Sequence, residues 1–215
     1  MIQSKKDLAF YIAADRIMNG YPAFRGFKSV LKETFAIGGG KVVVIKYLYH
    51  LRKYAYYYNS HKRKLSWNTI MLTYEHYKLS KLGLRCGFSI GQNSLGYGAV
   101  IPHYGTIVIN SEARIGNYAV IHTSTCVAGG DKIIGDGFYL STGCQVVGSI
   151  RIGDGVTVAA HSLVNKSFDG NVLIAGAPAY VKRNEQPAWY DTDRDRERFS
   201  KYMEQIDIIR KKIYG

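Results

Sequence analysis

An aliphatic residue recurs at every sixth position through the middle of the chain, from Leu95 to Val164. The series slips by two residues between Ile107 and Ile109 and by one residue before Ile134, and each time it resumes. Thirteen positions follow this rule, and all carry Ile, Leu or Val: Leu95, Ile101, Ile107, Ile109, Ile115, Ile121, Val127, Ile134, Leu140, Val146, Ile152, Val158 and Val164. Neither the helical period of about 3.6 residues nor the strand period of two produces this spacing. A six-residue repeat is typical of a parallel β-helix, whose coils of about 18 residues stack their aliphatic side chains inward.

Register within such coils predicts which residues lie above one another. Ile101, Ile121, Leu140 and Val158 should stack on one wall of the β-helix. Gly directly follows several repeat positions, at Gly96, Gly116, Gly135 and Gly153. We expect these glycines to form the turns between strands, because Gly tolerates positive φ. The two slips are expected to be bulges or small loops.

Residues 1–84 show helical spacing and no six-residue repeat. Short helices are predicted at Asp7–Met18 and Phe27–Ile37, followed by a break at Gly38-Gly39-Gly40. One helical stripe follows the break at steps of four, three, four and three residues: Val44, Leu48, Leu51, Ala55 and Tyr58. Ser66 is a candidate cap for a further helix that extends to Leu82.

The repeat ends at Ala175-Gly176-Ala177-Pro178, and a helical pattern returns behind it. Apolar residues at helical spacing predict an amphipathic helix that packs on the β-helix or on a neighbouring subunit: Phe199, Tyr202, Ile206, Ile209 and Ile213. The predicted fold class is therefore mainly β. An α-helical region at 1–84 precedes a β-helix domain at 85–183, and a helical extension occupies 184–215.

Composition adds a strong positive charge to an ordinary globular chain of 215 residues. A net charge of +13 favours anionic partners such as a membrane face, a phosphorylated ligand or nucleic acid. The basic and aromatic cluster Tyr54–Lys64 fits contact with an anionic membrane surface, or packed tyrosines beside solvated lysines. No RNA- or DNA-binding motif accompanies it, so nucleic acid is not expected. No membrane-spanning run and no signal-peptide pattern occurs, so a cytoplasmic location is expected.

Cysteine usage predicts no disulfide or metal chemistry. Cys86, Cys126 and Cys144 fit neither a disulfide framework nor a CxxC metal motif. Buried or half-buried thiols are the simplest interpretation, and no metal site is expected.

Three histidines follow the stacked wall closely: His103, His122 and His161. Small residues share that wall, namely Ser141, Thr142, Ala159 and Ala160. Histidine accepts a proton near neutral pH, and small side chains let a ligand approach the backbone amides. A single histidine here could be a hydrogen-bonded structural residue, but the aligned three predict a site for proton transfer.

The segment Ile101–Ile109 (IPHYGTIVI), with Ala113-Arg114-Ile115-Gly116 behind it, resembles the signature of the serine acetyltransferase family of hexapeptide-repeat acyltransferases. The resemblance continues to Ala175-Gly176-Ala177-Pro178-Ala179 and covers roughly residues 84–183. It implies a left-handed parallel β-helix, an acetyl-CoA-dependent O-acetyltransferase and a homotrimer. His103 matches the general base that takes the proton of the acceptor hydroxyl. We further expect acceptor contacts at His122 and Tyr104 and CoA contacts at Ser141, Thr142, Ala159, Ala160, Lys166 and Lys182.

Two departures narrow the expected acceptor. Serine-specific members carry an Asp that orients the catalytic histidine, and Phe88 occupies the matching position here. They also have a second histidine in a longer loop after the Gly-Gly pair, whereas the loop Gly129–Ile133 is short and has none. The chain therefore looks more similar to members that acetylate units of a surface polysaccharide or its lipid-linked precursors, at the inner face of the membrane.

Several alternatives stay open. Serine or a xenobiotic is the alternative acceptor for the same base. A metal lyase of the γ-carbonic anhydrase type shares the β-helix and binds zinc through three histidines, but it needs an H-x4-H pair that this sequence lacks. A non-catalytic scaffold with merely hydrogen-bonded histidines is the remaining alternative.

Overall fold

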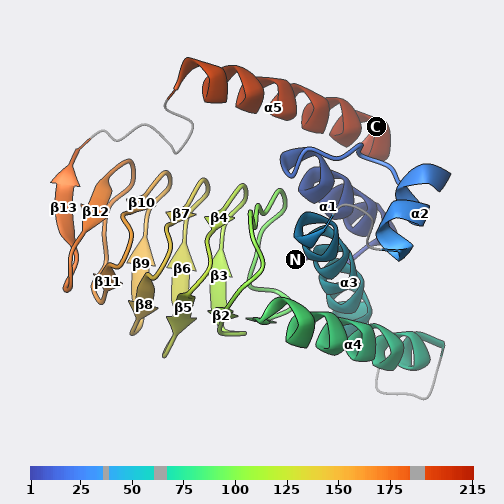
Figure 1. Ribbon diagram of the computed structural model, residues 1–215, viewed down its shortest axis with the longest axis horizontal. Coiled ribbons are helices and arrows are strands. Elements are labelled where there is room, and N and C mark those ends of the chain that lie inside the picture. The colour runs from blue at the N-terminus through green and yellow to red at the C-terminus, as the bar shows by residue number, and fades with distance from the viewer. Residues whose placement is uncertain (36–38, 61–66, 185–191) are drawn as a thin grey trace.

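A parallel β-helix forms the centre of the molecule, and a layer of helices closes its N-terminal end (Figure 1). The computed structural model describes residues 1–35, 39–60, 67–184 and 192–215. Three sheets make the walls: sheet 1 has the order β1-β2-β5-β8-β11, sheet 2 the order β3-β6-β9 and sheet 3 the order β4-β7-β10-β12-β13. The predicted β-helix with N-terminal helices and a C-terminal helix is confirmed.

The strands are short, as coils with three sides require. Their bounds are β1 Phe88–Ile90, β2 Ile107–Ile109, β3 Ala113–Ile115, β4 Val120–Ile121, β5 Thr125–Ala128, β6 Lys132–Ile134, β7 Tyr139–Leu140, β8 Gln145–Val147, β9 Ile150–Ile152, β10 Thr157–Val158, β11 Leu163–Val164, β12 Leu173–Ala175 and β13 Tyr180–Arg183. The helices are α1 Lys5–Met18, α2 Phe27–Thr34, α3 Gly40–Ser60, α4 Trp67–Cys86 and α5 Asp193–Tyr214.

The six-residue repeat forms the core of the β-helix. Each of the thirteen repeat positions is at most 4% exposed. In sheet 3, Ile121 pairs with Leu140 and Leu140 with Val158, and the Val100–Val120 bridge places Ile101 next to this column. The predicted wall of Ile101, Ile121, Leu140 and Val158 is confirmed.

The two slips lie at corners of the coils, and the first is not a bulge at Ile107–Ile109. Both of these isoleucines are buried in the regular strand β2. The extra residues lie before the strand, because eight positions separate Ile101 from Ile109 whereas six separate Ile121 from Val127. They lengthen the loop 102–106, which carries His103.

The second slip lies in the corner 128–131, where a buried lysine holds the backbone. The ammonium of Lys132, with the side chain 0% exposed, donates to the carbonyl oxygens of Ala128 at 2.7 Å and Gly129 at 2.5 Å. Burial lowers the pKa of this lysine. The corner is therefore a closed small loop, as expected.

Glycine follows the repeat positions for a reason that differs from the prediction. Gly96 and Gly116 do not have positive φ; instead, the next coil passes so close that a Cβ at Gly96 would lie 2.6 Å from the backbone of Gly116. Positive φ occurs two residues later in these turns, at Gly98 and Tyr118. Close stacking of the coils, and not backbone handedness, accounts for these glycines.

The predicted N-terminal helices are present, with α3 in the centre of the layer. Val44, Leu48, Leu51 and Ala55 are buried as the stripe predicts, but Tyr58 is 49% exposed. The end of α2 predicted at Ile37, Gly38 of the predicted break, the proposed cap Ser66 and residues 61–64 of the basic cluster lie outside the described residues. All three cysteines carry free thiols, buried at Cys86 and Cys144 and half-buried at Cys126, as predicted.

A buried ion pair fastens the helical layer to the first coil. Arg52 of α3 donates two hydrogen bonds to the carboxylate of Asp15 in α1, at 2.7 and 3.1 Å. It donates two more to the carbonyl oxygens of Leu95 and Gly96, at 2.7 and 2.6 Å, while Asp15 accepts from the backbone N–H of Ala99 at 3.0 Å. One network thus fixes two helices against the β-helix, which sets the position of the site described below.

Helix α5 returns from the far end of the β-helix to the N-terminal helices (Figure 1). Its buried Ile206 packs in a cluster with Phe10, Ile17 and Met18 of α1. Phe199 meets Tyr118 of the β-helix edge-on, with ring centroids 6.0 Å apart. The predicted amphipathic helix is confirmed, and its partner is mainly α1.

Candidate functional site

The predicted histidine wall is one corner of the coils, where sheet 3 passes into sheet 1. We call it the histidine corner: a first loop at 102–106 and lower loops at 122–124, 141–144 and 159–162. The lower loops stack in register, because the N–H of His122 donates to Leu140 O at 3.0 Å and the N–H of Ser141 to Val158 O at 3.2 Å. In the same way, Ala159 donates to Ile174 O at 2.9 Å. The structure therefore brings His122, Ser141 and Ala159 into one column.

The first loop is longer than the others and is tied to the start of the β-helix. The N–H of Gly105 donates to Cys86 O at 2.8 Å, and the N–H of Ile107 donates to Gly87 O at 2.9 Å. Gly105 has a φ of 145°, and a Cβ there would lie 2.9 Å from the side chain of Thr123 in the loop below. This glycine lets the longer loop lie close on the next coil, which leaves the side chain of His103 exposed at the loop's outer edge.

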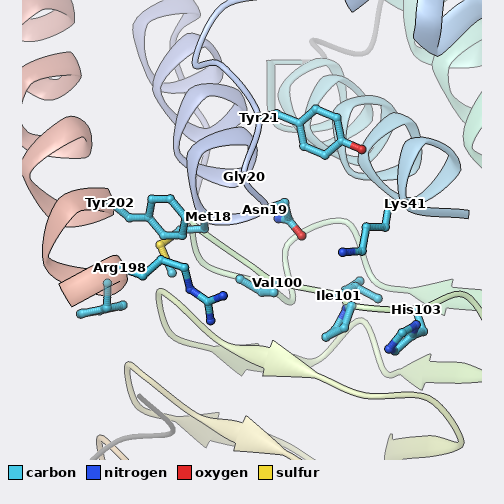
Figure 2. A pocket seen from close by; sticks show the side chains of 12 residues that line it. Met18, Asn19, Gly20, Tyr21, Lys41, Val100, Ile101, His103, Arg198 and Tyr202 are labelled. Atoms are coloured by element: carbon cyan, nitrogen blue, oxygen red, sulfur yellow. The ribbon is translucent and has the colours of Figure 1, made fainter. Parts of the chain in front are cut away.

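His103 lines a cavity of about 530 Å³ between the first coil and the helices. Val100, Ile101 and Pro102 contribute an apolar wall from the coil. Figure 2 shows Lys41, at the start of α3, on the same side as His103, with Arg198 and Tyr202 of α5 on the opposite side. Met18, Asn19, Gly20, Tyr21 and Phe199 complete the lining. The volume lies within the range of about 300–1,000 Å³ that is typical of small-molecule sites.

Asn19 presents an acceptor to this cavity. Its side-chain N–H groups donate to the carbonyl oxygens of Asp15 and Ala99, at 2.7 and 2.8 Å. Its amide oxygen is turned toward Lys41 and the cavity (Figure 2). Because Asp15 and Ala99 also belong to the Arg52 network, the same contacts that fasten the helices hold Asn19 in place.

His122 is not among the described residues that line the cavity, and it is linked to a tyrosine. Its Nε2 and the hydroxyl of Tyr139 are 2.8 Å apart. Burial, together with the nearby charge of His103, lowers the pKa of His122, and burial raises the pKa of Tyr139. Both groups are therefore neutral near pH 7.

The structure places the other predicted site residues away from this cavity. Tyr104 turns to the opposite side of its loop, against the backbone of Gly40, and lines a separate depression of about 250 Å³. Ser141, Thr142, Ala159 and Ala160 lie on the lower loops of the histidine corner. Lys166 stacks over the ring of Tyr180, 4.1 Å from its centroid, and Lys182 is exposed in β13. Within one chain, the predicted base and the predicted CoA contacts thus occupy different parts of one surface.

His161 and Phe88 lie outside the column of His122, Ser141 and Ala159, so the three histidines do not stack directly on one another. His161 has a φ of 59°, a strained value for a residue with a side chain, and a Cβ at Gly143 would lie 2.5 Å from its ring. Gly143 therefore leaves the room that the His161 ring occupies. Phe88 is buried against Tyr47, with ring centroids 5.0 Å apart. No carboxylate stands among the described residues that line the His103 cavity.

Sequence reasoning missed most of the residues that complete the cavity. Asn19 and Tyr21, Lys41, and Arg198 come from three separate segments of the chain, and no motif marks them. Tyr202 was predicted only as part of an apolar helical face. In the described parts of the chain, no group of three or more His, Cys, Asp or Glu side chains is arranged to hold a metal ion. None of the described helices is long and apolar enough to cross a membrane.

Comparison with known proteins points to one family. No protein-family model matches the chain. Serine acetyltransferase 4 of Arabidopsis thaliana is 32% identical over 49% of this chain, a match that covers 33% of that relative. The chain resembles the serine acetyltransferases. The putative colanic acid biosynthesis acetyltransferase WcaF of Escherichia coli is 30% identical over 45% of this chain and 50% of its own length.

A solved structure supports the same fold. The serine acetyltransferase of Brucella abortus, in complex with coenzyme A, superposes with a TM-score of 0.56 at 20% identity, covering 82% of this chain and 67% of that one. This likeness extends beyond the β-helix into the helices. The sequence matches to the curated relatives span between a third and a half of their lengths, so they support the β-helix domain and leave the activity of the whole protein to be proposed.

Proposed function

We propose that this protein is an acetyl-CoA-dependent O-acetyltransferase in which His103 is the general base. The observation that carries the proposal is the place of His103: it stands at the wall of a cavity of about 530 Å³ and at the head of the histidine corner. A hydroxyl is a poor nucleophile until a positioned base takes its proton, and histidine is suited to this near neutral pH.

The reaction proceeds by direct attack on the thioester. A ring nitrogen of His103 takes the proton of the acceptor hydroxyl while its oxygen forms a bond to the acetyl carbonyl carbon. Backbone N–H groups of the coil stabilise the negative charge that develops on the carbonyl oxygen. The C–S bond then breaks, the CoA sulfur leaves with the electron pair, and the proton passes from His103 to that sulfur.

The lower loops of the histidine corner would hold acetyl-CoA. Small side chains at Ser141, Thr142, Ala159 and Ala160 allow the extended arm of CoA to approach the backbone, and Lys166 and Lys182 would meet its phosphates. These loops form an open surface in one chain. We propose a homotrimer in which the β-helix of a neighbouring subunit supplies the other side of the groove. Light scattering should give three times the chain mass of 24.1 kDa.

The acceptor is proposed to be a sugar of a surface polysaccharide or its precursor. Free serine carries an ammonium group, and no carboxylate among the described lining residues would pair with it. Tyr21, Phe199 and Tyr202 offer aromatic surface, and Asn19 offers an acceptor for a hydroxyl. The likeness to WcaF, a putative acetyltransferase of colanic acid biosynthesis, points the same way.

The deciding experiment measures CoA release from acetyl-CoA with three classes of acceptor: sugars, free serine and the hydroxyl-bearing antibiotic chloramphenicol. We expect a sugar to accelerate release. Efficient transfer to serine would replace the sugar proposal by serine O-acetyltransferase, and transfer only to the antibiotic would indicate a xenobiotic enzyme. Absence of thioester cleavage with every acceptor would favour a scaffold.

The helical layer is proposed to touch the inner face of the cell membrane. Along α4, apolar and aromatic side chains are exposed on one stripe: Trp67, Ile70, Tyr74, Tyr77 and Leu84. Lys78 and Lys81 border this stripe, their ammonium groups 5.4 and 5.1 Å from the centroids of Tyr74 and Tyr77. An apolar stripe edged by lysines is complementary to an anionic bilayer surface.

Vesicle binding tests this contact. Lys78→Glu with Lys81→Glu should weaken binding to phosphatidylserine-containing vesicles about tenfold or more, because each lysine is attracted to the anionic surface. Arg194→Glu, the same charge change at the start of α5, is the matched control. If both proteins bind equally, or if α4 instead pairs two trimers in light scattering, the membrane proposal is wrong.

A further inference from the structure

We propose that the acceptor carries an anionic group, a carboxylate or a phosphate, that Lys41 binds in the His103 cavity. This inference rests on the proposed function, because it assigns the cavity to the acceptor and names the chemistry of that acceptor.

The charges of the cavity favour an anion. Lys41 and Arg198 line it, and the described lining contains no Asp or Glu. Lys41 has no ion-pair partner among the residues that the structure describes. A cavity with unbalanced positive charge and apolar walls attracts anions more strongly than an open surface does.

Arg198 is a secondary contact. It already forms an ion pair with Asp195 one helical turn away, at 2.7 Å, and both side chains are partly exposed. Exposed pairs of this kind contribute little free energy, so Arg198 can exchange Asp195 for a ligand at small cost. Lys41 is therefore the residue on which the proposal depends.

One sugar could contact Lys41 and His103 at the same time, through two different substituents. Lys41 lies in the first turn of α3, and His103 lies in the first loop of the histidine corner. Both side chains lie on the same side of the cavity (Figure 2). A sugar ring against Val100 and Ile101 would present one hydroxyl to His103 and an acidic substituent to Lys41. Asn19, which two hydrogen bonds hold in place, would make a further polar contact with the same sugar ring.

The phosphates of CoA are the competing occupant of these cations. If CoA used Lys41, loss of that charge would weaken CoA binding and leave acceptor binding unchanged. The two assignments therefore give opposite results when each ligand is measured alone.

Binding without turnover provides the test. The wild-type protein, free of acetyl-CoA, is titrated by calorimetry or ligand-observed NMR with two matched pairs: glucuronate against glucose, and glucose 6-phosphate against glucose. We expect at least one charged member to bind about tenfold or more tightly than glucose, because a hydrogen bond to a charged group is stronger than a neutral one. Lys41→Gln should remove this preference, and Lys46→Gln, an equal charge change farther along α3, should keep it.

Each other outcome contradicts the inference. Equal binding of the charged and neutral sugars, no binding of any charged probe at millimolar concentration, or an unchanged preference in Lys41→Gln would reject an anionic acceptor. A weaker CoA affinity in Lys41→Gln, with unchanged sugar binding, would assign the lysine to CoA. Slow hydrolysis of acetyl-CoA by the wild-type protein is scored separately: its absence would count against the acetyltransferase proposal, while the Lys41-dependent binding of charged sugars would still support the anion site.

Discussion

The first loop of the histidine corner and the loops below it are built on the same stacked wall, yet they have different surroundings. The first loop is two residues longer, and α1, α3 and α5 cover it, so His103 faces a cavity. The lower loops follow the regular repeat and carry small residues such as Ser141 and Ala159 on an open surface. A small insertion and a covering layer of helices thus convert one turn of a regular repeat into a candidate reaction site.

The difference also divides the proposed work between two partners. The first loop, flanked by helices, can select an acceptor, whereas the open column is suited to an extended ligand that a second subunit covers. The column of lower loops forms only if the coils stack in regular register, whereas the His103 cavity forms only if distant segments of the chain pack together. The following substitutions test that division, beginning with the largest expected effect.

Replacement of His103 should have the largest effect on activity. His103→Ala is expected to lower kcat/KM for acetyl transfer by about 10²–10⁴-fold, the usual contribution of a general base. Because the side chain of His103 is exposed, the circular dichroism and the unfolding curve of the variant should match those of the wild-type protein. His161→Ala, in a lower loop, is the matched control and should lose far less. Equal losses in the two variants would remove the distinction between the covered and open loops.

The covering helices should depend strongly on Arg52. Arg52→Ala is expected to reduce the free energy of unfolding by about 3–5 kcal/mol, because it leaves the buried carboxylate of Asp15 without its partner. Denaturant unfolding measures the loss. Hydrogen exchange should show faster exchange in α1 and the first coil than in the coil of Leu140. Uniformly faster exchange along the whole chain would argue that the helical layer and the β-helix do not differ in their dependence on this pair.

Truncation of a core side chain beneath the lower loops should reduce the free energy of unfolding somewhat less than Arg52→Ala does. Leu140→Ala removes a fully buried side chain from the column of sheet 3 and should destabilise the protein by about 2–5 kcal/mol. In this variant, faster hydrogen exchange is expected in β4, β7 and β10, whereas α1 should stay as protected as it is in the wild-type protein. A change below about 1 kcal/mol would show that neighbouring coils close the cavity by shifting.

The smallest effect concerns the titration of His122. Its pKa is lowered by burial and by the charge of His103, so NMR titration should place it below the usual value of about 6.5. His103→Ala should raise it, because one of the two causes is removed. Below about pH 6.5, His122 binds a proton in the unfolded chain more readily than in the native protein. The free energy of unfolding therefore declines as the pH falls from about 6.5 to the lowered pKa of native His122. His122→Gln should flatten this decline; an unaltered slope would assign it to other groups.

The part of the fold with a fixed local period could be predicted, because six-residue spacing determines which side chains face inward. The same register aligned His122, Ser141 and Ala159 correctly. The helices could be predicted from their apolar stripes, but the buried Arg52 could not, since its partners Asp15 and Leu95 lie far away in sequence. The burial of Lys132 could not be predicted for a similar reason. Its ammonium group donates to backbone carbonyl oxygens, which every residue type carries.

The candidate site could be predicted only where it follows the repeat. His103 stands out beside a recognisable segment, whereas Lys41, Asn19 and Arg198 become neighbours through the packing of three helices. The insertion was visible as a slip but was assigned to the wrong place. Ile107 and Ile109 are both buried because they alternate as in any strand. The two extra residues therefore lie in the loop 102–106, before this strand.

Helix α5 crosses back over the molecule, and the hydroxyl of Tyr214 donates to Asp7 at 2.7 Å, so the last helix of the chain lies beside the first. During synthesis the β-helix leaves the ribosome before α5 does. His103 is then already in place on its coil, but the wall with Arg198 and Tyr202 is missing. The cavity is therefore completed only after the β-helix has formed, and a nascent chain that has folded only its β-helix has the base without the wall that α5 supplies.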